Sequence, residues 1–219
     1  MMTREKMRTQ NFPAIGLFII LFLCSSASHS GSSPFNESVV IFNTICAKCH
    51  EAECSGRLSF NAAFEASRNH VIRHYGAASG KQWLQRELTI ILNHMKEKCS
   101  YYPMDVVIPP QRIWSSEILE DMSTLLERYY FIPIGSFTPG KYNLSLNLQL
   151  DTKVTIHLVS ENFNMILDDC YPSQDNKITI PFQVTEANNY YLRIYPQKPV
   201  TIRELVITTQ QDHPETQEK

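Results

Sequence analysis

The sequence has no run of basic residues and little net charge. Its 219 residues carry a formal net charge of −2 at pH 7. The first 32 residues contain three basic residues and one acidic residue, so the rest of the chain has a net charge of −4. A nucleic-acid or anionic-lipid partner normally requires a basic patch or stripe. We therefore expect no nucleic-acid partner.

The chain also lacks an apolar run long enough to cross a bilayer comfortably. A transmembrane helix needs about 20 apolar residues, whereas the apolar run near the start extends only from Ala14 to Cys24. Basic residues precede this run and the small residues Ser26–Ser28 follow it, which is typical of a secretory signal peptide. We interpret residues 1–30 as a signal peptide and expect a periplasmic protein, which associates with a membrane only if the leader is retained.

The sequence has only one Cys-x-x-Cys pair, whereas a structural zinc site needs a second, similarly spaced ligand pair. It also lacks the βαβ pattern that accompanies a thioredoxin-like dithiol. The pair that is present, Cys46-Ala47-Lys48-Cys49, is followed at once by His50. This is the attachment signature of a c-type haem. The two thiols can add to the haem vinyl groups while the imidazole lies beneath the iron. We therefore predict one covalent haem c on Cys46 and Cys49, with His50 as an axial iron ligand.

A methionine is available for the other side of the iron. Met104 follows Pro103 in a loop, and a thioether opposite a histidine suits electron transfer. His94 and Met95 are alternatives, but both are embedded in an expected helix, so we favour Met104. Apolar residues recur at helical spacing on both sides of the haem motif and of this loop, which predicts helices at 38–45, 60–75, 79–98 and 115–127.

Two further histidines, His70 and His74, stand four residues apart and share one helical face. This spacing makes them formal candidates for a second metal site. Arg68 and Arg73 lie close by in the sequence, and histidines in such a setting are usually solvated or hydrogen-bonded. We favour the second interpretation.

Five cysteines remain after the leader, and haem attachment accounts for two of them. An oxidising compartment permits Cys54 and Cys99 to form a disulfide. The alternative is that both are small buried thiols. If they pair, Cys170 is left without a partner.

From Tyr130 the pattern changes from helical spacing to alternation of apolar and polar residues, as in 142–150 and 154–158. Alternation is typical of strands with one buried face. Short strands at this spacing predict a small antiparallel β-sandwich or jelly roll over residues 131–210, followed by a polar tail at 211–219. We find no catalytic constellation in it, and we interpret Asp168-Asp169 as a turn.

Taken together, the haem motif, the methionine loop and the expected helices over residues 35–130 resemble the mono-haem, class I-like cytochrome c family. The resemblance implies an all-α haem domain at 33–130, with His50 proximal and Met104 distal. The predicted fold class is accordingly α+β, with two domains. In many members a Gly-Pro dipeptide follows the motif, and a carbonyl there accepts the second N–H of the proximal histidine. This chain has Gly56-Arg57 in the comparable place, so the sequence does not identify the hydrogen-bond partner of His50.

These expectations describe an exported electron carrier rather than an enzyme, with redox proteins as partners and a β-domain that docks a further partner. Two alternatives stay open. An iron without its methionine ligand would make a gas or redox sensor or a peroxidase-like protein. In the other alternative, the β-domain binds a polymer and the haem is accessory. Exposed aromatics among Tyr190, Tyr191 and Tyr195 would favour polymer binding, and their burial would disfavour it.

Overall fold

A computed structural model of the chain describes residues 34–50 and 63–210. Gly31–Lys219 form one compact unit. The predicted leader, Cys54, Gly56-Arg57 and the polar tail lie outside the described residues. Among the described residues, no helix has the length and apolar character needed to cross a membrane.

The first helical segment contains a wide turn. It comprises α1 (Pro34–Ile41), the π-helical turn η1 (Phe42–Cys46) and α2 (Ala47–His50). Two buried polar side chains inside it donate to the backbone one turn earlier: Asn43 Nδ2 donates to the Val39 carbonyl at 2.9 Å, and Thr44 Oγ1 donates to the Val40 carbonyl at 2.7 Å. Buried polar groups need such partners. This segment carries both cysteines of the haem motif.

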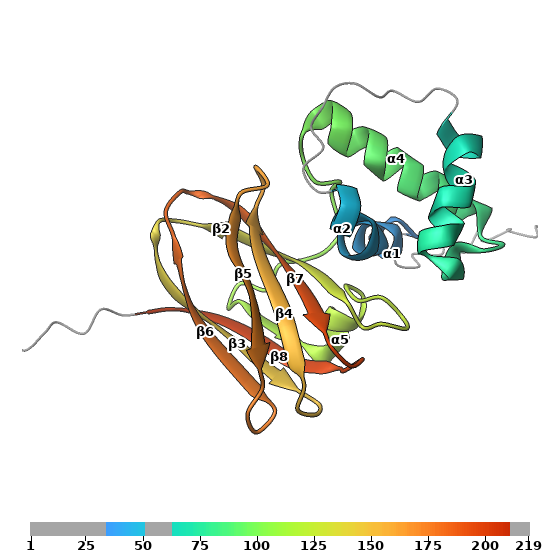
Figure 1. The fold of residues 1–219 in the computed structure, drawn as a ribbon. Coiled ribbons are helices and arrows are strands. Elements are labelled where there is room, and N and C mark those ends of the chain that lie inside the picture. The colour runs from blue at the N-terminus through green and yellow to red at the C-terminus, as the bar shows by residue number, and fades with distance from the viewer. Residues whose placement is uncertain (1–33, 51–62, 211–219) are drawn as a thin grey trace, which may run out of the picture. The chain divides into compact units, whose positions relative to one another are not determined.

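Two further helices pack against this segment. They are α3 (Ala63–His74) and α4 (Gln82–Lys98), joined by the 3₁₀ turn η2 (Gly76–Ala78). The helices α3 and α4 lie side by side (Figure 1). Helical spacing puts one apolar stripe of α4 on the inner face, and this stripe is buried against the first segment: Leu84, Leu88, Ile91 and Met95. The helices expected at 38–45, 60–75 and 79–98 are thus present.

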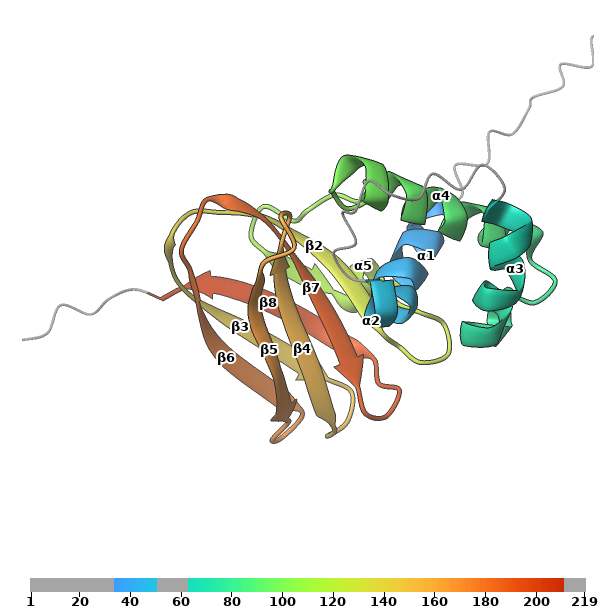
Figure 2. The same ribbon diagram turned by 45° about the horizontal axis from the view of Figure 1, so that its top comes forward.

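The remaining described chain forms two antiparallel sheets, with strand orders β1-β8-β3-β6 and β2-β7-β4-β5. Figures 1 and 2 show them as two layers. The strands are β1 (Ile113–Ser115), β2 (Tyr130–Phe137), β3 (Gly140–Leu148), β4 (Lys153–Ser160), β5 (Met165–Pro172), β6 (Lys177–Val184), β7 (Asn188–Pro196) and β8 (Ile202–Thr209).

Alternation along the strands builds the core between the two layers. In β3, for example, Tyr142, Leu144, Leu146 and Leu148 are buried while the residues between them are not. Successive side chains of a strand point to opposite faces, so each strand sends every second residue into the core. This confirms the antiparallel β-sandwich that the alternation predicted.

The predicted fold class as a whole is wrong, because the helices do not form a separate all-α cytochrome c-like domain. Their apolar core includes Phe131 of β2 and Val159 of β4, so it is completed by the sandwich. The helix expected at 115–127 is mostly absent. Strand β1 and a short helix, α5 (Ser116–Glu120), occupy this region, and Trp114 is buried in the core of the sandwich. The fold is a β-sandwich with short helices packed on one sheet.

The position of Trp114 gives a stability prediction. Trp114 is fully buried, and its replacement by alanine leaves a cavity in the sandwich core. We expect Trp114→Ala to lower the free energy of unfolding by about 3–5 kcal/mol, measured by urea denaturation. Val107→Ala, at a residue that is 85 % exposed, serves as the control and should change stability by less than about 0.5 kcal/mol. Equal stabilities of the two variants would show that β1 is not part of the core.

Candidate functional site

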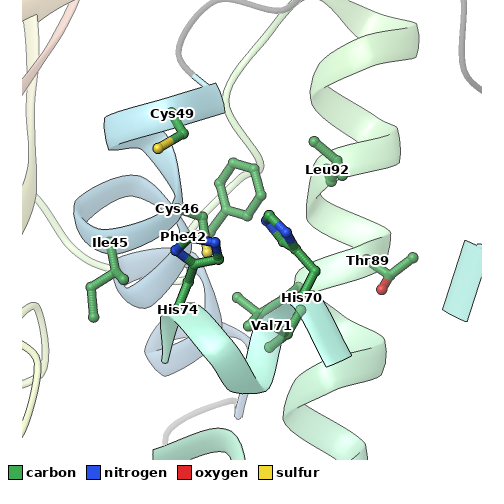
Figure 3. A pocket seen from close by; sticks show the side chains of 10 residues that line it. Phe42, Ile45, Cys46, Cys49, His70, Val71, His74, Thr89 and Leu92 are labelled. Carbon is green, nitrogen blue, oxygen red and sulfur yellow. The ribbon is translucent and has the colours of Figure 1, made fainter. Parts of the chain in front are cut away.

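A small apolar pocket lies among the first helical segment, α3 and α4. Its volume is about 70 Å³. Figure 3 shows His70 and His74 extending from α3 toward the segment that carries Cys46. The pocket is lined by Phe42, Ile45, Cys46, Cys49, His70, Val71, His74, Leu88, Thr89 and Leu92.

The two cysteines of this pocket are free thiols with different surroundings. Burial raises the pKa of Cys46 to about 12, and the nearby Cys49 adds to this effect. A thiol reacts as its thiolate, so the raised pKa makes Cys46 less reactive at neutral pH than an ordinary thiol. Cys49 is exposed.

The histidines of the pocket lie close together, with ring centroids 4.5 Å apart. Both are exposed on α3. Within the described part of the chain, no group of three or more His, Cys, Asp or Glu side chains could hold a metal ion. His70 and His74 thus lie side by side, as their spacing predicted. Among the described residues they are not part of a larger cluster of metal ligands.

Met104 lies at a different cavity from Cys46 and Cys49. Its neighbours there include Pro133 of β2 and Tyr191 of β7. Asn36 fixes the loop next to it, because Asn36 Nδ2 donates to the Asp105 carbonyl and the Asp105 N–H donates to Asn36 Oδ1, each at 3.0 Å. Met104 is partly buried and packs against both the helical core and the sandwich core.

The predicted haem c and the resemblance to cytochromes are contradicted. Within the described residues, no group of three or more His, Cys, Asp or Glu side chains could hold a metal ion, and Met104 lines a different cavity from Cys46 and Cys49. Of the two alternative ligands, Met95 is buried in the helical core and His94 Nε2 lies 3.2 Å from Ser100 Oγ. The side chain of His50 is outside the described residues. The individual ligand assignments depend on the cofactor and stay predictions from the sequence alone.

Cys99 is disulfide-bonded. Cys46, Cys49 and Cys170 are free, and the predicted partner Cys54 lies outside the described residues. Cys99 itself ends α4 in a left-handed conformation with φ of 53°, and its N–H donates to the Met95 carbonyl at 3.0 Å. The disulfide therefore attaches at the point where the helix stops.

A second site lies on the outer face of the sheet β2-β7-β4-β5. Register places four residues in one row across its strands: Phe131 pairs with Arg193, Arg193 with His157, and His157 with Asp168. Residues in register on one face are within contact distance of each other. His157 Nε2 indeed lies 3.1 Å from Asp168 Oδ1. The expected turn at Asp168 is wrong, because Asp168 belongs to β5.

An open cavity of about 350 Å³ lies over this row. Lys48 of α2 reaches it from the helical side, and its ammonium lies 4.4 Å from the ring centroid of Tyr129 and 5.0 Å from that of Tyr195. An ammonium over an aromatic face is attracted by the ring quadrupole. The lining residues are Ala47, Lys48, Thr155, His157, Arg193 and Tyr195.

Arg193 is the most deeply buried polar group of this cavity, with 1 % of its surface exposed. Its Nη2 donates to Tyr101 Oη at 3.2 Å. Tyr101 is itself held by ring contacts, including one with Tyr191 at 4.4 Å between centroids. The guanidinium is therefore fixed by an aromatic cluster at one edge of the cavity.

The three tyrosines of β7 have separate positions. Tyr190 is buried in the sandwich core, and Tyr191 is stacked on Phe131. Burial, assisted by the charge of Glu161, raises the pKa of Tyr191 to about 12. Tyr195 alone of the three lines the cavity. The exposed row of aromatics that would favour polymer binding is thus not formed.

Sequence reasoning missed Lys48, Thr155 and Arg193 as site residues. A signal was present, since alternation puts Thr155 and His157 on the outer face of one strand, and Arg193 and Tyr195 on the outer face of another. What the alternation does not show is that β4 and β7 are neighbours. Lys48 lies between the two cysteines of the haem motif, and the motif gives it no role.

No family model matches the chain, and no curated protein matches it. Several solved structures resemble part of it. One is a GH26-CBM35 β-(1,4)-mannanase from Podospora anserina, with 15% identity, a TM-score of 0.30, and coverage of 42% of this chain and 21% of that chain. Another is a family 35 carbohydrate binding module from Clostridium thermocellum, with 15% identity, a TM-score of 0.27, and coverage of 37% of this chain and 70% of that chain.

A third is a point mutant of a carbohydrate binding module of family 29, with 15% identity, a TM-score of 0.25, and coverage of 38% of this chain and 60% of that chain. None of these three is named as a cytochrome. At such scores the likeness says nothing about the site of this protein.

The thiol environments give a labelling prediction. At about pH 8, iodoacetamide should modify the exposed Cys49 and Cys170 much faster than Cys46, because the raised pKa of Cys46 leaves almost no thiolate. Mass spectrometry of the tryptic peptides measures the three rates. Modification of Cys46 as fast as Cys170 would show that Cys46 is not buried in the pocket.

Proposed function

We propose that the protein is a polysaccharide-binding module and that the cavity over the outer face of β4 and β7 is its binding site. The observation that supports this proposal is the combination of Tyr195 with hydrogen-bonding groups from Thr155, His157 and Arg193 in one open cavity. With the leader that the sequence predicts, binding would take place in the periplasm.

The chemistry of the lining suits a sugar ring. Tyrosine presents an apolar ring together with a polar tip, and the faces of a sugar ring carry C–H groups that pack on such a surface. Sugar hydroxyls both donate and accept hydrogen bonds. Thr155 offers a hydroxyl that does both, and Arg193 offers a fork of donors. Binding sites of this kind combine apolar surface with a few fixed polar groups.

The site is also rigid. Thr155 pairs with Tyr195 in register, and His157 pairs with Arg193, so four lining residues stand on two hydrogen-bonded strands. A second support is the ring contact between Tyr129 and Tyr195, with centroids 5.2 Å apart. Groups that are fixed before binding lose little conformational entropy when a ligand arrives.

The proposal is tested with Tyr195→Ala. Loss of the ring removes apolar surface from the cavity, and we expect binding to the best polysaccharide to weaken about tenfold, which corresponds to about 1.4 kcal/mol. Affinity electrophoresis with neutral and acidic polysaccharides in the gel measures the retardation of the full chain.

The matched control is Trp83→Ala. Trp83 is an aromatic residue on α4 that is 41 % exposed and does not line the cavity, so its loss should leave retardation unchanged. The proposed function would be contradicted if no polysaccharide retarded the unmodified chain. It would also be contradicted if Tyr195→Ala and Trp83→Ala changed the retardation equally.

A further inference from the structure

The two cysteines of the Cys-x-x-Cys motif have no part in the proposed polysaccharide site. Cys46 and Cys49 line the pocket beside α3 and α4, whereas the cavity over β4 and β7 has a different lining. Both are free thiols. Exchange between a thiol and a disulfide needs a thiolate and access to it, and a βαβ frame is not among these requirements. The motif is therefore equipped for this exchange without a thioredoxin-like fold.

The spacing of the two thiols brings them to one side of the first helical segment. Cys46 is the last residue of η1, and Cys49 lies three residues later in α2. Side chains three apart on a helix share a face, with Cβ atoms about 5–6 Å apart, and Cys49 indeed helps to raise the pKa of Cys46. A disulfide needs Cβ atoms about 3.5–4.5 Å apart, so a small shift of α2 lets the two sulfurs bond. Since α2 contains only four residues, few helical hydrogen bonds oppose this shift.

The two thiols differ in access, and this difference gives each of them a role. Cys49 is exposed, whereas Cys46 is only partly exposed. A disulfide from solution therefore meets Cys49 first. Cys46 stands behind it and reacts within the molecule, where fixed proximity raises its rate far above that of the same encounter in solution. A pair with an exposed attacking thiol and a shielded partner transfers two electrons in two exchange steps.

The surroundings of the pair select the substrate and the direction of transfer. The pocket beside the thiols has a volume of about 70 Å³ and includes the apolar side chains of Ile45, Leu88 and Leu92, so it suits a small disulfide with aliphatic carbons. A dithiol is a weak reductant when its reduced form is stabilised. Burial and the nearby Cys49 instead raise the pKa of Cys46 to about 12. Its thiolate is thus not stabilised, which favours transfer of electrons to the substrate.

We propose that Cys49 and Cys46 reduce low-molecular-mass disulfides. Cys49 gives its proton to solvent and its thiolate attacks one substrate sulfur, so that a mixed disulfide forms and the first half of the substrate leaves and takes up a proton. Cys46 then loses its proton to solvent, and its sulfur attacks Cys49 Sγ and releases the second half as a thiol. The pair becomes a disulfide, and the substrate gains two electrons and two protons. One chain reduces one disulfide, and this activity goes beyond polysaccharide binding.

The test uses the full chain and bis(2-hydroxyethyl) disulfide, without oxygen and at about pH 8, where an ordinary thiol is partly ionised. Remaining thiols are blocked with N-ethylmaleimide, and tryptic peptides are analysed by mass spectrometry without reduction. Trypsin cleaves after Lys48, so a disulfide between Cys46 and Cys49 links two tryptic peptides. We expect this linked product. Cys170, an exposed free thiol on β5, is the internal comparison and should stop at the mixed disulfide.

Three variants separate the steps. Cys46→Ser should accumulate the mixed disulfide on Cys49, because the second step is lost. Cys49→Ser should slow the consumption of the Cys46 thiol at least about tenfold, because a shielded thiol with a raised pKa reacts slowly. Cys170→Ser is the matched control and should form the linked product at an unchanged rate. Circular dichroism verifies that the variants are folded.

Two results would overturn the proposal. A stable mixed disulfide on Cys49 of the unmodified chain would show that Cys49 is an ordinary exposed thiol like Cys170. Consumption of Cys46 at an unchanged rate in Cys49→Ser would show that Cys49 is not the attacking thiol. Neither result bears on polysaccharide binding, which gel retardation measures separately, so the two proposals fail independently of each other.

Discussion

The structure depends on covering one face of the sheet β2-β7-β4-β5. Phe131, Tyr191 and Val159 point away from the sandwich core, and a bare sheet would expose all three. Tyr101 and the helices cover them instead. Burial of each such side chain contributes about 1.5–3 kcal/mol, so the helices and the sandwich stabilise each other. This is the physical reason why the helical segment is not an independent domain.

The cover is incomplete, and the candidate site lies where it ends. The outward residues of β7 are Tyr191, Arg193 and Tyr195. Tyr191 belongs to the aromatic cluster that the helices cover, and Arg193 and Tyr195 line the open cavity. Arg193 stands at the border, where its guanidinium is held by Tyr101. A buried cation is costly unless strong hydrogen bonds or an anion compensate it.

The first helical segment contributes to two surfaces at once. Side chains three or four apart on a helix share a face, whereas adjacent ones do not. Cys46 and Cys49 accordingly line the pocket beside α3 and α4, while Lys48 lies over Tyr129 and Tyr195. The residue that looks like a spacer in the cysteine motif is the one that reaches the sheet.

The sequence by itself determined the elements, because helical spacing and alternation are local properties of the chain. Three of the four helices that it predicted are present, and so is the β-sandwich. Only the tertiary structure decided which elements meet. Asn36 holds Asp105 from 69 residues away, Arg193 holds Tyr101 from 92 residues away, and these contacts place Met104 and build the cationic cavity. Such pairings depend on which faces bury each other, and no local pattern encodes that choice.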